Sequence, residues 1–361
     1  MSGGEIAATV LRGDAAARGA QHGSRFAASI REYTEERVHL ACAGDWAGRA
    51  GTRADILRLA ERMLPAHHDY APGLYHEMLA MAEAAGISPA EAVIVGGFTD
   101  FVDAVRALGQ AAPEEDDCPA ALVPATPASR GVPWFAQTWD MHDTATKHVV
   151  LLDIQPDDGP AALVFSTAGC LGQIGMNEAG ICVGINNLNA ADGRVGVTWP
   201  FVVREVLRQT TLADALACVL RAPLAGGHDF LLLDAQGRGY NVEAMPTYAA
   251  VTPLADAPLV HTNHCLDAAC QAREAGKADE LRRSSELRLE IATRMLAGEV
   301  DLEVLLAVLR EPRAICRRST APWHVESSGA VIARPDTREL WAVWGVPADR
   351  PFIRFAVGRH G

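Results

Sequence analysis

The order of the predicted elements indicates an α+β fold in which two sheets lie between layers of helices, preceded by an N-terminal helical segment. After residue 118 the chain reads as a set of strands, two helices, further strands and two further helices. Most neighbouring strands are separated only by turns of hairpin length, so parallel βαβ winding fits less well. Before residue 105, apolar residues recur with helical spacing instead.

The N-terminal segment contains several helical stretches. One apolar face runs from Ala15 to about Leu40, and the same spacing returns over residues 56–64, where Pro65 is expected to end the helix. Ser88-Pro89-Ala90-Glu91 is a capping box with proline in the first turn, and it opens a helix that runs toward Val105.

Two glycines, Gly19 and Gly23, lie inside the first helical stretch. A glycine-rich phosphate loop follows a strand, and no strand is predicted before them. We therefore expect these glycines to allow close packing against another element.

The rest of the chain supplies the strands and helices of the predicted sandwich. The expected strands are Cys118–Val123, Pro133–Thr138, Val149–Ile154, Ala161–Thr167, Gln173–Met176, Ile181–Asn186, Phe230–Asp234, Tyr240–Ala244, Tyr248–Val251, Leu259–Thr262 and a closing hairpin of Gly329–Ala333 with Glu339–Trp344. The expected helices are Trp199–Gln209, one that starts after Thr211 and is capped by Asp214, Asp279–Leu296 and Leu302–Leu309.

Composition and charge exclude several classes of function. The 361 residues carry a net charge of −13, so nothing favours a nucleic-acid or anionic-membrane partner. The N-terminus has no apolar signal core and no apolar run approaches membrane-spanning length. The eight cysteines form no CxxC pair. We expect a cytoplasmic protein with free thiols.

The acidic run Glu114–Asp117 gives way at Cys118 to an apolar, strand-like segment. The acids require water, and Pro119 biases Cys118 toward an extended backbone. The cysteine therefore stands where an exposed linker, residues 107–117, enters a buried strand. This placement suits a nucleophile, and it also fits the first residue of an ordinary strand.

Polar side chains follow three other predicted strands. Asp140 could hold a thiol or an amine, or simply close a turn. Asn186 and Asn187, behind the hairpin turn at residues 175–181, could donate to an oxyanion, although asparagine is also common in turns. The segment His261–Cys265 is rich in polar groups, but its spacing matches no standard zinc pattern. No metal and no cofactor is expected.

Six motifs follow one another along the chain: Arg18–Gly23, Asp117-Cys118, Gln137–Asp140, Ile174–Ile181 with Gly184–Asn187, His261–His264 and Ala314–Arg317. In this order they resemble the acyl-coenzyme A:6-aminopenicillanic acid acyltransferase (isopenicillin N acyltransferase-like) family of N-terminal-nucleophile (Ntn) hydrolases, relatives of penicillin V acylase and bile salt hydrolase. The resemblance covers nearly the whole chain, and its NEAGI and HTNH elements are specific in combination.

The resemblance implies a four-layer αββα Ntn-hydrolase sandwich that cuts itself before Cys118. The thiol attacks the Asp117 carbonyl, an N→S shift gives a thioester, and water releases residues 1–117. That fragment is expected as a helical pro-segment packed on the core formed by residues 118–361. The new α-amine, with a reference pKa of ~7.7–8.0, would serve as general base.

The resemblance also assigns roles position by position. Asp140 matches the acid that holds the amine or thiol of the cysteine. Asn263 matches the side-chain donor of the oxyanion hole, and Asn186 a second donor through its backbone N–H. Arg317 matches an arginine near the site, with Arg288 as a rival.

Two residues depart from the family pattern. Asp117 stands where many members have glycine, and Pro119 where threonine is common. Aspartate does precede the cut bond in the aspartylglucosaminidase branch of Ntn enzymes, so cleavage remains compatible with Asp117. Pro119 removes one backbone N–H beside the nucleophile.

The expected function is that of a self-processing N-terminal-cysteine amidohydrolase or acyltransferase, which cleaves a non-peptide or small-peptide amide C–N bond through an acyl-thioenzyme. Hydrolysis is favoured over transfer from a thioester, because no coenzyme A site is apparent. An unprocessed, non-catalytic binding module is a further alternative. A papain-like protease needs a dedicated histidine, and none of the twelve stands out. Expected partners are a small-molecule amide and the cleaved N-terminal fragment. Whether the protein also pairs with a second copy of itself is left open.

Overall fold

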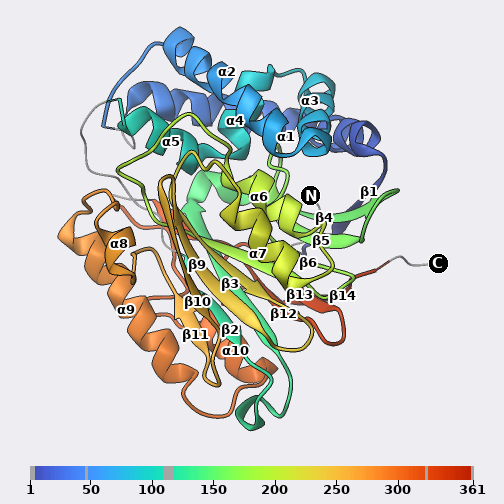
Figure 1. Ribbon diagram of the computed structural model, residues 1–361, viewed down its shortest axis with the longest axis vertical. Coiled ribbons are helices and arrows are strands. Elements are labelled where there is room, and N and C mark those ends of the chain that lie inside the picture. The colour runs from blue at the N-terminus through green and yellow to red at the C-terminus, as the bar shows by residue number, and fades with distance from the viewer. Residues whose placement is uncertain (1–4, 45–47, 109–117, 322–323, 359–361) are drawn as a thin grey trace.

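The computed structural model describes residues 5–44, 48–108, 118–321 and 324–358. Two β-sheets lie face to face between layers of helices, as Figure 1 shows. Helices α6 and α7 lie on the outer face of the eight-stranded sheet, helices α1–α5 form a group at one end of the molecule, and α9 and α10 cover the outer face of the six-stranded sheet. This αββα order confirms the predicted fold class.

The eight-stranded sheet has the order β1-β4-β5-β6-β7-β8-β9-β10. Strand β1 is parallel to β4, and the other neighbours are antiparallel. The bounds are β1 Ala8–Gly13, β4 Val149–Pro156, β5 Ala162–Thr167, β6 Ile174–Asn177, β7 Cys182–Asn187, β8 His228–Leu233, β9 Gly239–Met245 and β10 Tyr248–Pro253.

The six-stranded sheet has the order β11-β2-β3-β12-β13-β14 and is antiparallel throughout. The bounds are β2 Ala120–Val123, β3 Trp134–His142, β11 Leu259–His261, β12 Val325–Arg334, β13 Glu339–Trp344 and β14 Ile353–Ala356.

The helices fall into an N-terminal group, a pair on the eight-stranded sheet and a C-terminal group. They are α1 Ala15–Ala43, α2 Arg53–Tyr70, α3 Pro72–Ala85, α4 Pro89–Gly96, α5 Phe98–Arg106, α6 Trp199–Val206, α7 Leu212–Leu220, α8 Ala268–Gln271, α9 Asp279–Met295 and α10 Leu302–Leu309. No single helix in the described ranges has the length and apolarity to cross a membrane; α3 and α4 meet that test only as a pair bent by 106°.

The two sheets interlock through phenylalanines that lie over glycines. Phe135 of β3 lies against Gly184 of β7, and Phe165 of β5 lies against Gly329 of β12. A side chain at either glycine would overlap the ring of the opposite sheet. Because glycine has no Cβ, the two sheets can approach closely at these positions, and both rings are fully buried.

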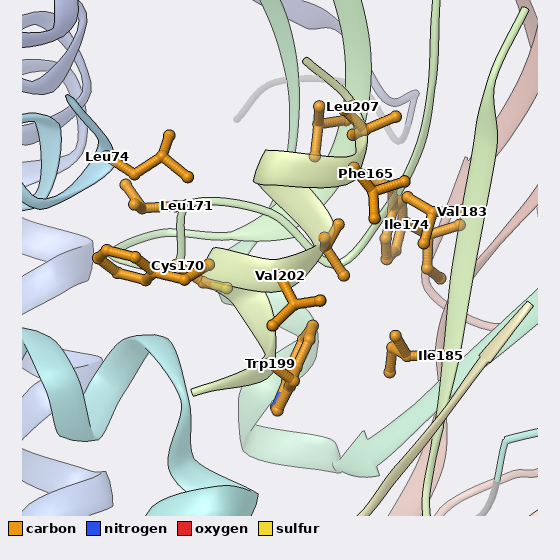
Figure 2. Packing of buried hydrophobic residues seen from close by; sticks show 14 of the residues in the cluster. Leu74, Phe165, Cys170, Leu171, Ile174, Val183, Ile185, Trp199, Val202 and Leu207 are labelled. Atoms are coloured by element: carbon orange, nitrogen blue, oxygen red, sulfur yellow. The ribbon is translucent and has the colours of Figure 1, made fainter. Parts of the chain in front are cut away.

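The other face of the eight-stranded sheet packs against α6. Val183 and Ile185 of β7 lie toward Trp199 and Val202 of that helix (Figure 2). All four side chains are buried, so this contact fixes the segment that follows residue 198 on the sheet.

The glycines of the first helix have the packing role that the sequence predicts. A Cβ at Gly19 or Gly23 would overlap the backbone carbonyl of Glu77 or Met81 on α3. Arg18 beside them forms a buried ion pair with Glu77 (Nη2–Oε2 2.8 Å), and Glu77 also pairs with Arg204 of α6 (2.8 Å). Burial alone would raise the pKa of Glu77, but the two guanidinium groups outweigh it and lower that pKa. The cluster therefore connects α1 and α3 to α6.

Strand β1 corrects the prediction that residues 1 to about 105 are helical. The strand has one buried apolar side chain, Leu11, so it carries little periodic signal. It is stabilised by its ladder with β4 and by Gln21, whose side-chain amide bonds both the N–H and the C=O of Arg12. The ladder partner β4 is distant in sequence, so local pattern does not reveal the strand.

Pro65 does not end its helix, contrary to the prediction, because α2 continues to Tyr70. The proline is exposed, so the carbonyl it leaves unpaired can bond water. Beyond it, His67 lies 2.9 Å from Thr198 Oγ1, and the Tyr70 hydroxyl donates to the Cys218 carbonyl at 2.8 Å. Tertiary contacts hold the last turn.

Three smaller differences from the prediction also occur. The helix opened by the Ser88 capping box breaks at Gly97, which has a non-helical backbone and no room for a side chain against Thr198. Helix α7 is capped by the Thr211 hydroxyl, which accepts the Asp214 N–H, and not by Asp214 itself. The short elements α8 and β14 were not predicted. The other predicted elements after residue 118 occur within a few residues of their expected bounds.

Gly19→Ala should destabilise the protein. In an unpacked helix this change would gain up to about 1 kcal/mol, but here the methyl group meets the Glu77 carbonyl, and overpacking costs about 1–3 kcal/mol. Urea unfolding monitored by circular dichroism measures the sign. The matched control is Ser24→Ala, exposed on the same helix, which should change the unfolding free energy by less than about 0.5 kcal/mol. A Gly19→Ala protein as stable as the wild type would contradict the α1–α3 contact.

Candidate active site

Cys118 is held through both of its backbone polar groups. Its N–H donates to Asn263 Oδ1 at 2.6 Å, and its carbonyl oxygen accepts from Asn186 Nδ2 at 2.6 Å. Asn186 belongs to β7 of the eight-stranded sheet, whereas Cys118 precedes β2 and Asn263 follows β11 of the six-stranded sheet. The predicted nucleophile thus lies where the two sheets meet.

The thiol of Cys118 contacts the backbone of Asp140. The Asp140 N–H donates to Sγ at 3.3 Å, and Sγ lies 3.8 Å from the carbonyl oxygen of the same residue. An N–H directed at sulfur favours the thiolate. Burial raises the pKa of each of the other seven cysteines, residues 42, 170, 182, 218, 265, 270 and 316. The structure therefore brings Asp140 to the thiol through its main chain.

Asn263 is oriented by groups on three sides. Its Oδ1 accepts from Arg288 Nη1 at 3.0 Å as well as from Cys118, its Nδ2 donates to the Asn187 carbonyl at 3.2 Å, and its N–H donates to Ser285 Oγ at 2.9 Å. Two donors at one atom identify that atom as the amide oxygen. A role for Asn263 as an oxyanion donor would use Nδ2, which here bonds a carbonyl.

Of the two candidate arginines, Arg288 is the one in contact with Asn263. It lies three residues after Ser285, so both face the same side of α9, and its side chain is fully buried. Arg317 is positioned differently. Its N–H donates to Ser327 Oγ at 3.0 Å, and Ser327 pairs with Asp140 in the β3–β12 ladder. The Arg317 side chain lines a hollow that includes the exposed Arg313 and Arg318.

A cavity of about 30 Å³ adjoins Cys118. Its apolar walls come from both parts of the chain: Tyr33, Val95 and Phe98 before residue 118, and Trp139, Met141, Ile185 and Trp199 after it. Its polar lining comprises Arg37, Thr99, Thr167, Gln173, Asn187 and His228. The predicted cleavage residue Asp117, and the acidic run before it, lie outside the described residues.

Behind the two asparagines, three ionisable side chains form a buried cluster. His261 lies between Asp229, at 3.3 Å from Nδ1, and Glu243, at 2.9 Å from Nε2. Burial lowers the pKa of His261, but the two carboxylates outweigh this and raise it; burial raises the pKa of Asp229 to about 7. Asp229 pairs with Asn186 across β7 and β8, and His261 is two residues from Asn263. The cluster therefore joins the strands that carry both asparagines.

Comparison with known proteins identifies the family. The family model described as acyl-coenzyme A:6-aminopenicillanic acid acyl-transferase matches residues 127–344, more than half of the chain. The chain belongs to this family. The resemblance inferred from the sequence motifs is thereby confirmed.

One curated relative in the family is the acyl-coenzyme A:6-aminopenicillanic-acid-acyltransferase 40 kDa form of Emericella nidulans. It is 25% identical over 220 residues, and the matched region spans 60% of this chain and 58% of that protein.

Solved structures similar to this family member include a variant of the conjugated bile acid hydrolase from Clostridium perfringens, with a TM-score of 0.45 and 9% identity over 67% of this chain and 99% of that one. Penicillin V acylase from Agrobacterium tumefaciens gives a TM-score of 0.39 and 10% identity over 66% and 86% of the two chains.

Sequence reasoning missed several residues at this site. Arg37 had a usable signal, because it falls four residues after Tyr33 on the apolar face of the first helix, where a charge should be exposed. His228 and Gln173 carry no such mark, since a strand end and a loop admit many polar residues. His261 was singled out only as part of a polar strand end, and its carboxylate partners come from two other strands.

His261→Gln should destabilise the protein by about 3–5 kcal/mol at pH 8, because it removes the imidazole partner that two buried carboxylates share. At pH 5.5 the loss should be smaller, since Asp229, whose folded pKa is raised, then takes up a proton more readily than it does in the unfolded chain. Urea unfolding at both pH values measures this difference. The double variant His261→Gln/Asp229→Asn should recover most of the loss at pH 8. Equal losses at the two pH values would show that the cluster is not charged as described.

Proposed function

We propose that this protein is a self-processing N-terminal-cysteine enzyme that cleaves an amide C–N bond through an acyl-thioenzyme. The observation that carries the proposal is the pair of side-chain amides at Cys118, one on its nitrogen and one on its carbonyl. A structural cysteine at a strand end needs neither. A nitrogen held by the oxygen of Asn263 stays held after the peptide bond before it is cut, because the new α-amine still donates to that oxygen.

In the processing step, the Cys118 thiolate attacks the Asp117 carbonyl carbon. A C–S bond forms, the C–N bond breaks, and the nitrogen takes a proton to become the α-amine of Cys118. Water then hydrolyses the thioester, which restores the thiol and leaves a carboxylate at residue 117. Nucleophile and base end up on one residue, Cys118.

In the catalytic step, the α-amine accepts the thiol proton and the thiolate attacks the amide carbonyl of the substrate. The α-amine of an N-terminal residue has a pKa near ~7.7–8.0, so it can exchange protons at neutral pH. The contact from the Asp140 N–H to Sγ supports the thiolate. The leaving amine takes the proton, and the acyl group remains on sulfur until water or another amine removes it.

Oxyanion stabilisation in this proposal falls to Asn263 Nδ2. Arg288 and the Cys118 nitrogen donate to Oδ1, so Nδ2 is the donor end of the amide. One of its two hydrogens bonds the Asn187 carbonyl, and the other would serve the oxyanion. Asn186, expected to donate through its backbone, supports the site instead through its side chain, which fixes the Cys118 carbonyl. We assign the supporting arginine to Arg288, because it contacts Asn263 directly.

Transfer of the acyl group from a thioester to an amine is the second candidate. The family match and the relative named as an acyltransferase favour it. Hydrolysis and transfer share the acyl-thioenzyme, and they differ only in whether water or an amine resolves it. A panel of N-acyl amines and acyl thioesters, each with and without an acceptor amine, separates the two.

The purified protein should consist of two fragments, residues 1–117 and 118–361, that remain associated. Cys118→Ala should stay one chain, because it has no thiol to attack the preceding carbonyl. Intact mass spectrometry and N-terminal sequencing test this, and the larger fragment should begin Cys-Pro-Ala-Ala. An uncut wild-type chain with an unreactive Cys118 would support a binding module instead of an enzyme.

Asn263→Ala should lower kcat by roughly 10²–10³ with little change in KM, because charge develops on the carbonyl oxygen only in the transition state. Asn263→Asp should be at least as damaging, since a carboxylate repels the oxyanion. Steady-state kinetics on the processed protein test this, with circular dichroism as the check that each variant folds. Near wild-type kcat in Asn263→Ala would mean that backbone N–H groups alone hold the oxyanion.

A further inference from the structure

Arg37 of α1 is a fully buried cation in the wall of the Cys118 cavity. Its guanidinium carbon lies 4.6 Å from the ring centre of Tyr33 and 5.0 Å from that of Phe98, and both rings also line the cavity. Stacking between two rings fixes the plane of the guanidinium group. The cation is therefore a rigid part of the wall.

The hydrogen-bonding capacity of Arg37 is only partly used. Nη2 donates to Glu36 Oε1 at 2.7 Å, whereas the contacts of Nη1 with described residues are long, 3.8 Å to Met141 Sδ and 3.5 Å to His142 Nδ1. Within the described ranges Nε has no hydrogen-bond partner. A buried N–H without a partner is costly, so these donors call for an acceptor.

The charge of the cavity points to the same kind of ligand. Of the described residues that line it, Arg37 is the one with a permanent charge, and none is acidic. Glu36, its ion-pair partner, is a quarter exposed and does not line the cavity. Two buried acceptors, Gln173 Oε1 and Asn187 Oδ1, also lack partners in the described part of the chain.

We propose that this cavity binds a carboxylate of the substrate, so that the enzyme prefers amides with a carboxylate close to the bond that is cut. The inference rests on the proposed function and names the substrate class of that site. An arginine fork matches the geometry of a carboxylate. The cavity of about 30 Å³ has room for roughly two waters, close to the space of two carboxylate oxygens. The N–H of the substrate amide would donate to Asn187 or Gln173.

The wall that holds Arg37 is fixed before any ligand arrives. On α5, Asp100 Oδ2 accepts the Trp199 N–H at 2.6 Å, and Asp103 Oδ2 accepts those of Ala190 and Gly227 at 2.7 and 3.0 Å. His228 lines the cavity from the part of the chain after residue 118, and its Nδ1 lies 2.9 Å from Asp100 Oδ1. Prearranged donors lose little entropy on binding, so one carboxylate contact gives a measurable preference.

Binding is tested without turnover by protection of Cys118 from iodoacetamide in the processed protein. Butanoate and butanamide are matched in size and differ in charge. Butanoate should protect at a concentration about 10–100-fold lower than butanamide, the factor expected for one charge-assisted hydrogen bond. The double variant Arg37→Met/Glu36→Gln removes the cation without leaving Glu36 unpaired, and it should bring the two concentrations within about threefold.

Turnover is tested with matched coumarin amides and glycine conjugates. Succinyl-aminomethylcoumarin against its methyl ester puts the carboxylate on the acyl side, and butanoyl-glycine against butanoyl-glycinamide puts it on the amine side. In one of these two pairs, kcat/KM for the compound with the carboxylate should exceed kcat/KM for its uncharged partner by about 10–100-fold. The ratio should fall to within about threefold of one in Arg37→Met/Glu36→Gln and stay unchanged in Arg31→Met, an exposed arginine on the same helix.

The outcomes separate the two proposals. Cleavage of amides with no preference for either carboxylate, or with a preference that survives in Arg37→Met/Glu36→Gln, overturns the inference and leaves the proposed function standing. Protection by butanoate that depends on Arg37, without turnover of any amide, supports the carboxylate site and argues against the proposed function. Absence of both protection and turnover overturns both proposals.

Discussion

The side chain of Gln137 joins the two sheets beside the site, and the arrangement around Cys118 depends on it. Its amide bonds both the carbonyl oxygen and the N–H of Ile185, the residue before Asn186. Gln137 also pairs with Ala120 in the β2–β3 ladder, two residues from Cys118. A slip between the sheets by one residue would leave buried amide groups unpaired and carry Asn186 away from the Cys118 carbonyl. One side-chain amide therefore fixes the register of the nucleophile against the groups that hold it.

What the sequence could reveal was local. Apolar periodicity and the Ser88 capping box predict the helices and strands that form the layers of the sandwich. Polar residues at strand ends indicate Cys118, Asp140, Asn186 and Asn263 as one candidate site, and the structure brings these residues together. What it could not reveal depended on distant partners. The ladder of β1, the last turn of α2 and the face of α9 that carries Arg288 are each decided by contacts between segments far apart in the chain. Periodicity locates a helix, but it does not say which of its polar residues is covered.

Two buried charge clusters frame the site. The Asp229–His261–Glu243 cluster joins the two sheets behind the asparagines, and Arg18–Glu77–Arg204 joins the first helices to α6. Such clusters add little net stability over apolar packing, but a misplaced element would leave a charge buried without its counterion. They therefore penalise wrong arrangements of strands and helices more than they stabilise the right one. A site in which 2.6 Å contacts link three elements benefits from this selectivity.

The position of β1 bears on how the chain can be divided. This strand precedes every helix, yet it pairs with β4 of a sheet whose other members all follow residue 148. If it were absent, β4, whose residues are mostly buried, would become an open sheet edge, a ready template for pairing with another molecule. The proposed cut before Cys118 therefore does not follow a boundary between folding units. The two fragments would share one sheet, and residues 118–361 produced alone should behave as an incomplete domain that aggregates.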